Sequence, residues 1–320
     1  MDPKYTDAFI IRDNVLKQRE FSAINSAFRA ADIPMVPIKG MALLYEEDPY
    51  AETRLMCDID ILVRKDDLER SKDILLNSGY NIQKGSYSED YYRNHYHHIA
   101  FYGKHFLELH WSLSVPRPNV LHLPELWDKV RHLNAGKDAV TLLSPEDTIF
   151  SLALHLRRFN EPFSLRYIQD IYKILELHGN KLDWGYISKY SGLNRLKSLI
   201  YYVLISLKVN LGYRASDETL NMFYPGMLRS NLLKLFVAKI NPQNFEKMKK
   251  YAYVFLRFLM YDSARDFIRF IIFLPEEEFS RFYSIKFPSR RASVLYGLRF
   301  LAAPFLFLIE MSKNSRKTPE

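Results

Sequence analysis

Residues 56–63 read MCDIDILV, an apolar run that carries two aspartates, Asp58 and Asp60. The Ile, Leu and Val content predicts a β-strand, in which side chains at i and i+2 point to the same face. Two carboxylates would then lie side by side where the pattern requires core residues. Crowding of like charges is costly unless a cation compensates it. The run therefore predicts a strand that presents a cation-binding site.

The sequence on either side of this run predicts a small α/β unit with a third acid. We expect a helix at about 5–31, a short strand in 35–40, a helix at 65–80 that stops at Gly79, and two strands within 97–113 joined by a turn at Gly103 and Lys104. Glu108 lies in the second of these two strands, again among apolar residues. Metal-dependent phosphoryl and nucleotidyl transfer needs several carboxylates that converge on divalent ions. Asp58, Asp60 and Glu108 are therefore the candidate catalytic and metal-binding residues, with a merely solvent-exposed face as the alternative for each.

A loop suited to phosphate binding precedes the acidic strand. In PIKGMALLYEE (37–47) the short strand ends at Gly40, where a helix is expected to begin, so that the backbone at Gly40 and Met41 can approach a phosphate closely. Lys39 can supply a direct positive charge. Arg54 could hold triphosphate oxygens with both arms of its guanidinium, or be an ordinary exposed loop arginine.

The composition is that of a globular protein with a single cysteine. Of the 320 residues, 48% are hydrophobic and 15% aromatic, which excludes a disordered chain. Because Cys57 is the only cysteine, the chain cannot form an internal disulfide, which predicts a reducing, cytoplasmic setting. Cys57 itself is expected to be a small buried core residue. The N-terminus does not have the pattern of a signal peptide. The net charge of +8 favours anionic partners such as nucleotides, nucleic acid or a membrane surface, without choosing among them.

The pattern becomes mainly helical after about residue 140. Ser144 is expected to cap a helix that has Pro145 in its first turn, and helical periodicity then continues to about residue 240. We therefore predict an α/β domain at 1–140, a helical domain at 141–240 that would support the acceptor or the nucleotide, and a helical C-terminal extension at 241–320.

Two segments of the C-terminal extension could have further roles. The run 251–275 interleaves aromatic and basic residues at helical spacing, which favours core packing, with Arg257, Arg265 and Arg269 at the rim, over nucleic-acid binding. The hydrophobic stretch 294–311 is interrupted by an arginine and a proline. It is therefore expected to pack, or to touch a membrane peripherally, instead of spanning one.

Histidines are concentrated around the predicted strand pair, at positions His95, His97, His98, His105 and His110. Such a cluster can bind zinc, but no Cys-x-x-Cys or His-x-x-x-His pattern accompanies it, so the sequence disfavours a zinc site. His110 lies two residues after Glu108 and hence on the same strand face. It could orient that carboxylate or bind substrate.

Four segments taken together resemble the minimal bacterial nucleotidyltransferases of the DNA polymerase β superfamily: IKGMALLYEEDPYAETRLMCDIDILV (38–63), LELHWSL (107–113), LLSPEDTIFSLALHLRR (142–158) and LRYIQDIYKIL (165–175). More specifically, the chain is similar to a group known only as nucleotidyltransferase family proteins. The resemblance covers about residues 30–190. It implies an α+β fold, in which a polymerase-β-like domain built on a mixed sheet with flanking helices is followed by a mainly helical C-terminal region.

The resemblance also implies roles for individual residues. Asp58 and Asp60 would bind two Mg²⁺ ions, or Mn²⁺ in their place. Glu108 would be the third carboxylate, which helps to bind metal and to activate the attacking hydroxyl. Gly40 falls at the glycine turn of the superfamily, but the usual Gly-Ser or Gly-Gly pair is Gly40-Met41 here. The hydroxyl that would touch the triphosphate is therefore missing.

Lys39 could take the place of that hydroxyl. The segment between the glycine turn and the acidic strand is also longer than the superfamily norm. In the helical part, His155, Arg166 and Asp170 fall where the group has similar residues. We interpret His155 as a core histidine and Asp170 as a helix cap or buried salt-bridge partner, with nucleotide contact as the alternative.

The leading hypothesis is a cytoplasmic, Mg²⁺-dependent nucleotidyltransferase that moves a nucleoside monophosphate from an NTP to an acceptor. The sequence does not identify the acceptor, which could be a small molecule, a peptide, RNA or a protein. One alternative is a catalytically silent scaffold that binds nucleotide. Another is a toxin-type enzyme that modifies tRNA or protein.

Overall fold

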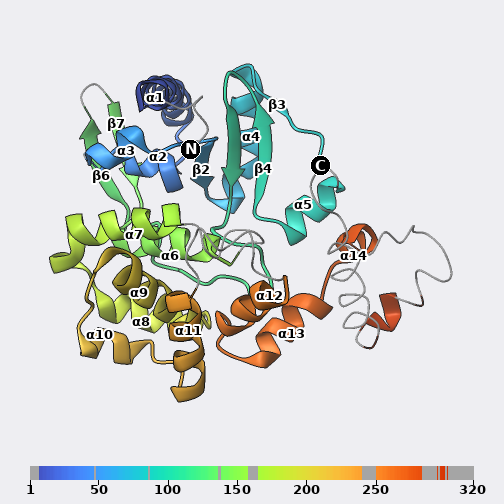
Figure 1. The fold of residues 1–320 in the computed structure, drawn as a ribbon. Helices are drawn as coiled ribbons and strands as arrows, with labels where there is room; N and C mark the ends of the chain where they lie inside the picture. The colour runs from blue at the N-terminus through green and yellow to red at the C-terminus, as the bar shows by residue number, and fades with distance from the viewer. Residues whose placement is uncertain are drawn as a thin grey trace.

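The chain folds into an α/β part and a helical part that lie against each other, with the last helices of the chain extending to one side (Figure 1). This computed structural model describes residues 7–46, 48–85, 87–135, 138–157, 165–239 and 250–282, together with 294, 296–299 and 301. The strands are β1 Met35–Pro37, β2 Ile59–Val63, β3 Asn81–Ile82, β4 His98–Tyr102, β5 Phe106–His110, β6 Arg131–Ala135 and β7 Asp138–Leu142. The helices are α1 Asp7–Ala30, α2 Lys39–Leu43, α3 Pro49–Thr53, α4 Leu68–Asn77, α5 Glu89–His95, α6 Pro145–His155, α7 Leu165–His178, α8 Trp184–Leu193, α9 Lys197–Leu211, α10 Asp217–Met222, α11 Met227–Lys239, α12 Lys250–Leu259, α13 Ala264–Ile272 and α14 Glu276–Phe282.

A five-stranded mixed sheet forms the centre of the α/β part, in the order β1-β2-β5-β4-β3. Strands β2 and β5 are parallel, and the other neighbouring pairs are antiparallel. The predicted pair within 97–113 is β4 and β5, and the turn between them contains Gly103 as expected. The predicted α+β class, a mixed sheet flanked by helices and followed by a helical region, is confirmed.

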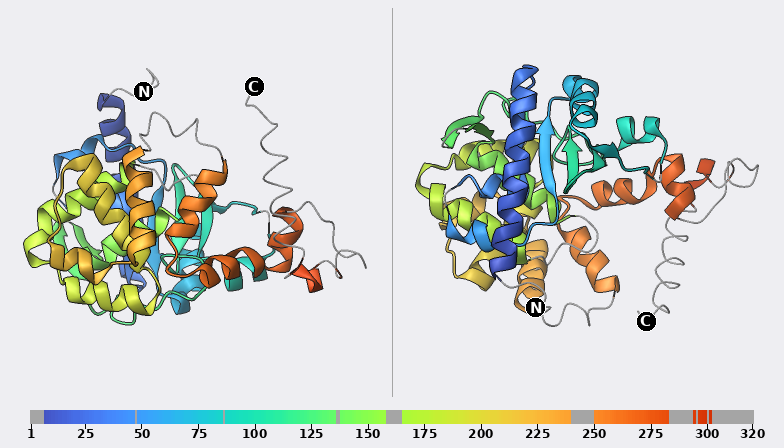
Figure 2. Two further views of the ribbon diagram at one scale, coloured as in Figure 1. Left: turned by 60° about the horizontal axis from the view of Figure 1, so that its bottom comes forward. Right: turned by 90° about the horizontal axis from the view of Figure 1, so that it is seen from above.

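One face of the sheet is apolar and is covered by α1 and α4. Ile59, Ile61 and Val63 of β2 pack there together with Phe21 and Phe28 of α1, all of them buried. Figure 2, in its right-hand view, shows the long α1 running beside the strands. Because alternate side chains of a strand point to opposite faces, this packing directs Asp60 and Leu62 to the other face of the sheet.

That other face turns toward the helical part. Leu62 and Val36 belong to the core cluster formed by α6, α7 and α9. Helix α6 starts as predicted, because the Ser144 hydroxyl accepts a hydrogen bond from the Asp147 N–H at 3.0 Å and Pro145 occupies the first turn. Asp60 and its neighbours therefore lie between the sheet and a packed layer of helices.

Three details differ from the sequence prediction. The strand begins at Ile59, so that Asp58 lies just before it. Cys57 is exposed, which corrects the prediction of a buried core residue, because the chain at this point has not yet entered the sheet. The hairpin of β6 and β7 was missed, although the buried side chains of Val140 and Leu142 extend the core beneath α1.

The C-terminal extension begins with α12 and α13, where the predicted aromatic and basic run forms amphipathic helices. Arg257 was expected at the rim of the core but is only 3% exposed. Most of the stretch 294–311 lies outside the described residues. Among the residues that the structure describes, no helix is both long and apolar enough to cross a membrane.

Candidate active site

The register of the sheet brings acids and histidines together on the face opposite α1. Asp60 of β2 lies beside Glu108 of β5, and His110 follows two residues later on the same face. Strand β4 is the other neighbour of β5, and its His98 is paired with His110 in the register of the sheet. His110 Nε2 is 3.0 Å from Asp60 Oδ1 and 3.1 Å from Glu108 Oε2. Glu108 thus lies on the strand adjacent to that of Asp60.

Lys39 provides a positive charge in the middle of this group. Its backbone has φ +55°, a conformation that is uncommon for residues other than glycine. Its Nζ donates a hydrogen bond to Asp60 Oδ1 and lies 3.4 Å from Glu108 Oε2. Because Lys39, Asp60 and Glu108 are all largely buried, the ammonium compensates much of the negative charge of the two acids.

Asp58 lies in the segment that leads into β2, and α1 holds this segment in place. The Asn14 side chain donates to the Arg54 carbonyl at 2.9 Å, and Lys17 Nζ donates to the Met56 carbonyl at 2.9 Å. Burial, together with the nearby charges of Asp60 and Glu108, raises the pKa of Asp58 to about 7. A cation that binds next to this carboxyl group would favour its ionised form and lower its pKa.

The other two acids are ionised more readily. Burial would raise the pKa of Asp60, but the Lys39 ammonium and the His110 ring outweigh burial and lower it. Burial likewise opposes ionisation of Glu108, and the hydrogen bond to His110, with the charges of His98 and Lys39, lowers the pKa of Glu108. The site therefore contains two stable carboxylates and one acid that titrates near neutral pH.

Two sets of three side chains among the described residues could hold a metal ion. Asp60, Glu108 and His110 form one, and His97, His98 and His110 form the other, with the ligand atoms of each set within 4.8 Å of one another. Asp58 belongs to neither set and acts on the site through its charge. Carboxylate oxygens suit Mg²⁺ or Mn²⁺, whereas three imidazoles suit a transition metal.

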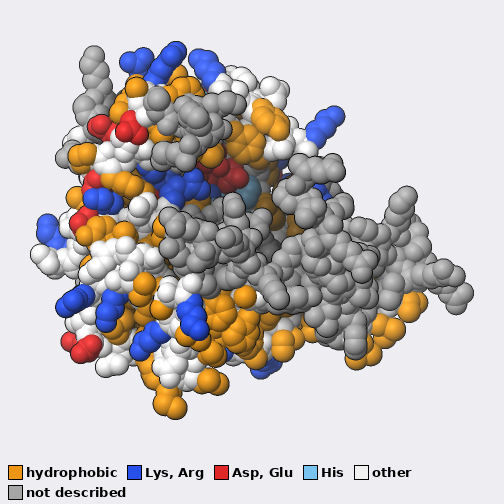
Figure 3. Space-filling view, viewed as in Figure 1, with side chains coloured by type: hydrophobic (Ala, Val, Ile, Leu, Met, Phe, Trp, Pro, Cys, Tyr) orange, Lys and Arg blue, Asp and Glu red, His pale blue; other side chains and the backbone are white. Residues whose placement is uncertain are grey.

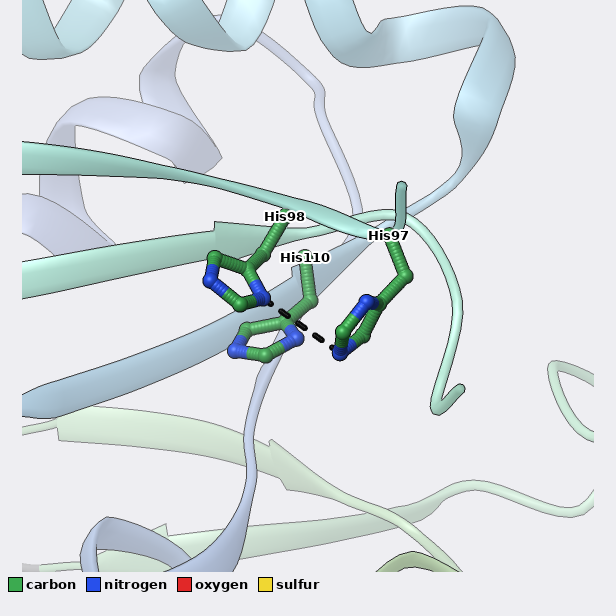
Figure 4. Close-up of side chains that lie close together, drawn as sticks. All are labelled: His97, His98 and His110. Carbon is green, nitrogen blue, oxygen red and sulfur yellow. Dashed lines mark hydrogen bonds between the residues drawn. The ribbon is translucent and has the colours of Figure 1, made fainter. Parts of the chain in front are cut away.

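The two sets share His110, and the second set brings together three of the five clustered histidines that the sequence disfavoured as a zinc site. Figure 4 shows the three rings beside one another on β4 and β5, with His98 Nδ1 3.3 Å from His97 Nε2. The expected absence of a zinc site rested on motif spacing along the chain, which does not register ligands that meet across two strands. In Figure 3, acidic and histidine side chains reach the surface in a hollow beside a strip of basic side chains.

The comparison with known proteins agrees with this geometry. A family model described as "Uncharacterised nucleotidyltransferase" matches residues 6–212, which is well over half of the chain. The chain belongs to this nucleotidyltransferase family. No curated protein matches it. The matched region contains the whole sheet, both sets of candidate ligands and the helices α6 to α9.

Arg54, which was expected to contact nucleotide, has a structural partner in this nucleotidyltransferase. The Arg54 guanidinium forms a two-armed ion pair with Asp170 of α7, with Nε–Oδ1 and Nη2–Oδ2 distances of 2.8 and 2.7 Å. The Tyr50 hydroxyl donates to the same carboxylate at 2.9 Å. Asp170 is thus the buried salt-bridge partner that the sequence favoured, and it joins the helical part to the segment before β2.

Gly40 makes this ion pair sterically possible. A Cβ atom at Gly40 would lie 2.3 Å from Arg54 Nη1 and 2.6 Å from Met56 Cγ. Gly40 lies inside the first turn of α2, one residue later than the strand-to-helix turn at which it was expected. The Met41 side chain is buried in the core beneath α1 and faces away from solvent.

The remaining predicted residues lie farther from the acids. His155 packs its ring 4.4 Å from that of Tyr167, and the guanidinium of Arg166 lies over the same ring at 5.2 Å. His155 is therefore a core histidine, as interpreted from sequence. His105 contacts Glu20 of α1 instead of the other histidines. His97 and His98 were considered as zinc ligands and disfavoured, and their closeness to Glu108 follows only once the strand register is known.

Proposed function

We propose that this protein is a Mg²⁺-dependent nucleotidyltransferase that transfers a nucleoside monophosphate from an NTP to an acceptor. The observation that carries the proposal is that Asp60 and Glu108 lie side by side on one face of the sheet, and that Asp58, just before β2, is close enough for their charges and its burial to raise its pKa to about 7. Lys39 offsets part of the negative charge of these three acids, and the charge that remains favours a divalent cation. Mn²⁺ would serve in place of Mg²⁺.

The donor set fits the proposed metal. Asp60 and Glu108 are ionised oxygen donors on rigid strands, and Asp58 becomes one as the pH rises through about 7. Bound there, the ions would orient the triphosphate and stabilise the charge that develops on it. Lys39 balances the acids when no metal is bound, and its ammonium can turn to a phosphate oxygen once metal takes its place.

The reaction joins the acceptor to the α-phosphate. The acceptor hydroxyl forms a bond to the α-phosphorus, the α–β anhydride bond breaks, and pyrophosphate leaves. The lowered pKa of Glu108 makes it a better acceptor of a hydrogen bond from the hydroxyl than a final acceptor of the proton. His98 Nε2 lies 3.4 Å from Glu108 Oε1, where its positive charge helps to keep Glu108 ionised, and the proton of the acceptor hydroxyl would leave to solvent.

The proposal is tested by turnover of Mg²⁺-NTP in variants of the acids. Asp58→Asn and Asp60→Asn should each lower pyrophosphate release by at least about a hundredfold, since each removes charge needed to hold metal. Asp73→Asn, an exposed site on α4, is the matched control and should leave turnover unchanged. Undiminished turnover in both acid variants would refute the assignment.

The position of Lys39 favours one second candidate, a nucleotide-binding scaffold without catalytic activity. Its ammonium already lies between Asp60 and Glu108, and a cation that stayed there would exclude a metal ion. Calorimetric titration with NTP, with and without Mg²⁺, separates the two functions. A scaffold would bind NTP equally in both conditions and release no pyrophosphate, whereas the enzyme would require Mg²⁺ for both steps.

The cellular setting and the acceptor are the remaining parts of the proposal. The single cysteine, exposed at Cys57, is compatible with a reducing cytoplasm. Incubation of the protein with labelled NTP and total cell extract would show whether label enters small molecules, peptide, RNA or protein, and so would identify the acceptor class.

A further inference from the structure

A cavity of about 370 Å³ adjoins the acid centre. Its walls come from α5, from the loop after β5 at 113–121, from the turn between α8 and α9, and from α12 to α14. His97 also lines it, and the centre of the His97 ring lies 5.5 Å from that of His110. Because His110 contacts Asp60 and Glu108, one wall of the cavity is only a single side chain away from the catalytic acids.

The charged side chains around the cavity leave a positive excess. Four arginines and two acids line it: Arg117, Arg157, Arg195, Arg257, Asp266 and Glu278. Glu278 pairs with Arg117, and Asp266 pairs with Arg195. Asp262 does not line the cavity, but its charge favours the charged form of Arg157, and it also accepts the backbone N–H of Ser198 at 2.6 Å at the start of α9. Among the described lining residues, arginines therefore outnumber carboxylates by two.

Several donors in this wall are buried and have no hydrogen-bond partner within the described part of the chain. They are Nε and Nη1 of Arg117 and Nε of Arg157. Buried guanidinium N–H groups without an acceptor are costly, and an anion that enters the cavity would satisfy them. Burial also lowers the pKa of Arg157, against the opposing effect of the nearby Asp262 and Asp266.

The rest of the lining is apolar or aromatic. Leu113, Val115, Leu121 and Phe270 are among the apolar residues, and Tyr91 is one of several tyrosines. A volume near 370 Å³ lies at the lower end of the range of small-molecule sites, about 300–1,000 Å³. The cavity therefore suits a compact ligand with an apolar or aromatic body and one anionic group.

The C-terminal extension closes this cavity against the α/β part. The Tyr91 hydroxyl donates to Glu278 at 2.6 Å, and Arg117 Nη2 donates to both oxygens of Glu278 at 2.9 and 2.8 Å. The backbone N–H of Ser88 donates to Glu277 at 2.7 Å. Helix α14 thus forms part of the cavity wall. This role of the C-terminal extension was not predicted from the sequence.

We propose that this cavity is the acceptor site, and that the acceptor is a small organic anion, bearing a phosphate or a carboxylate, which binds Arg117 and Arg157 and places its nucleophilic group beside His97. The proposal rests on the proposed nucleotidyl transfer and specifies its acceptor. A nucleic acid or a folded protein is too large for a cavity of this size. Labelling of a macromolecule is therefore an outcome that would count against it.

The test uses the full-length protein and three small probes in calorimetry: phenyl phosphate, benzoate and phenol. Phenyl phosphate or benzoate should bind, and neutral phenol should not. Arg117→Gln should weaken binding of the anion at least about tenfold, because it removes a charge-assisted hydrogen bond. Arg70→Gln, at an arginine that is 59% exposed on α4, is the matched control and should leave binding unchanged.

A second pair of variants keeps the test valid if Arg117→Gln does not fold. Val120 lines the cavity but is 73% exposed, so its replacement should not disturb the core. Val120→Glu places a negative charge at the rim and should weaken binding of the anion several-fold, whereas the neutral Val120→Gln should not. Equal binding to both variants, or no binding of either anion to the wild type, would overturn the proposal.

A third comparison separates this site from the nucleotide site. Phenyl phosphate should bind the Lys39→Met variant as tightly as the wild type, because Lys39 does not line the cavity. If anion binding depends on Lys39 instead, the probe occupies the nucleotide site and the proposal is wrong. Anion binding without any turnover of NTP would overturn the proposed function and leave an anion site. Turnover with label found only in RNA or protein would uphold the function and refute the small acceptor.

Discussion

Replacement of Asp58 by asparagine should stabilise the metal-free protein at neutral and alkaline pH. The carboxyl group has a pKa of about 7, raised by burial and by the charges of Asp60 and Glu108 from its ordinary value of 3.8. A raised pKa means that the folded state holds the proton more tightly than the unfolded state. The stabilising contribution is thus fully present below pH 3.8 and is lost as the pH rises through 7. Asparagine avoids this loss because it does not ionise.

The size of the effect follows from the shift. About three pKa units at about 1.36 kcal/mol each give an upper limit of about 4 kcal/mol. Asp58 is half-buried, so solvent screening reduces the expected gain to about 1–2 kcal/mol at pH 8. The gain should shrink steadily toward pH 5, since the wild-type carboxyl group is then mostly protonated in the folded state.

Urea denaturation in EDTA at pH 5, 6, 7 and 8 measures this difference, with Asp73→Asn as the surface control. Addition of Mg²⁺ should then reverse the order at pH 8, because the wild type gains the free energy of metal binding and the variant gains little. A stability difference that does not change between pH 5 and pH 8 would show that Asp58 is not strained by neighbouring charges.

Three further predictions concern the groups around the acids. Arg54→Ala should lower the free energy of unfolding by about 3–5 kcal/mol because it leaves the buried Asp170 charge unpaired, and a double replacement of Arg54 by Met and Asp170 by Leu should recover most of that loss in urea titrations. Gly40→Ala should destabilise by about 1–3 kcal/mol, seen as a lower Tm, since the new methyl group would displace the Arg54 guanidinium; a Tm equal to wild type would contradict the close approach. Lys39→Met should bind Mg²⁺ more tightly, on the order of tenfold above pH 7, because its ammonium no longer competes for Asp60, while NTP turnover falls; weaker Mg²⁺ binding in calorimetry would show that Lys39 supports the metal site.

Much of the site could be predicted because its signal is local. The alternation in β2, with apolar residues on one face and Asp60 on the other, is visible in eight letters of sequence. Glu108 shows the same alternation in β5. The cap at Ser144 and the stop at Gly79 are also short-range signals, and the structure confirms both.

The parts that could not be predicted depend on contacts between distant segments. Arg54 was expected to face a triphosphate, but it pairs with Asp170, which lies 116 residues away in the sequence. No local sequence pattern predicts that pairing. The meeting of His97 and His110 depends on the register between β4 and β5. Cys57 was placed in the core because the apolar run was read as one strand, whereas the strand begins only at Ile59.

The cavity beside His97 is the extreme case of such long-range assembly. The residues that line it come from positions between Tyr87 and Glu278 in the sequence. Arg117, for example, pairs with Glu278 of α14, which is 161 residues away. Helical periodicity in 251–275 correctly indicated packing, but it could not show that Arg257 would face inward toward a cavity instead of lying at the rim.

The most direct test of nucleotidyl transfer is the fate of the two ends of the triphosphate. The wild-type protein is incubated with Mg²⁺, total cell extract and NTP that is labelled either at the α-phosphate or at the γ-phosphate. We predict that α-label enters an acceptor, that γ-label is recovered as pyrophosphate, and that both outcomes disappear in Asp60→Asn. Transfer of γ-label to an acceptor, or transfer of α-label that persists in Asp60→Asn, would contradict the account.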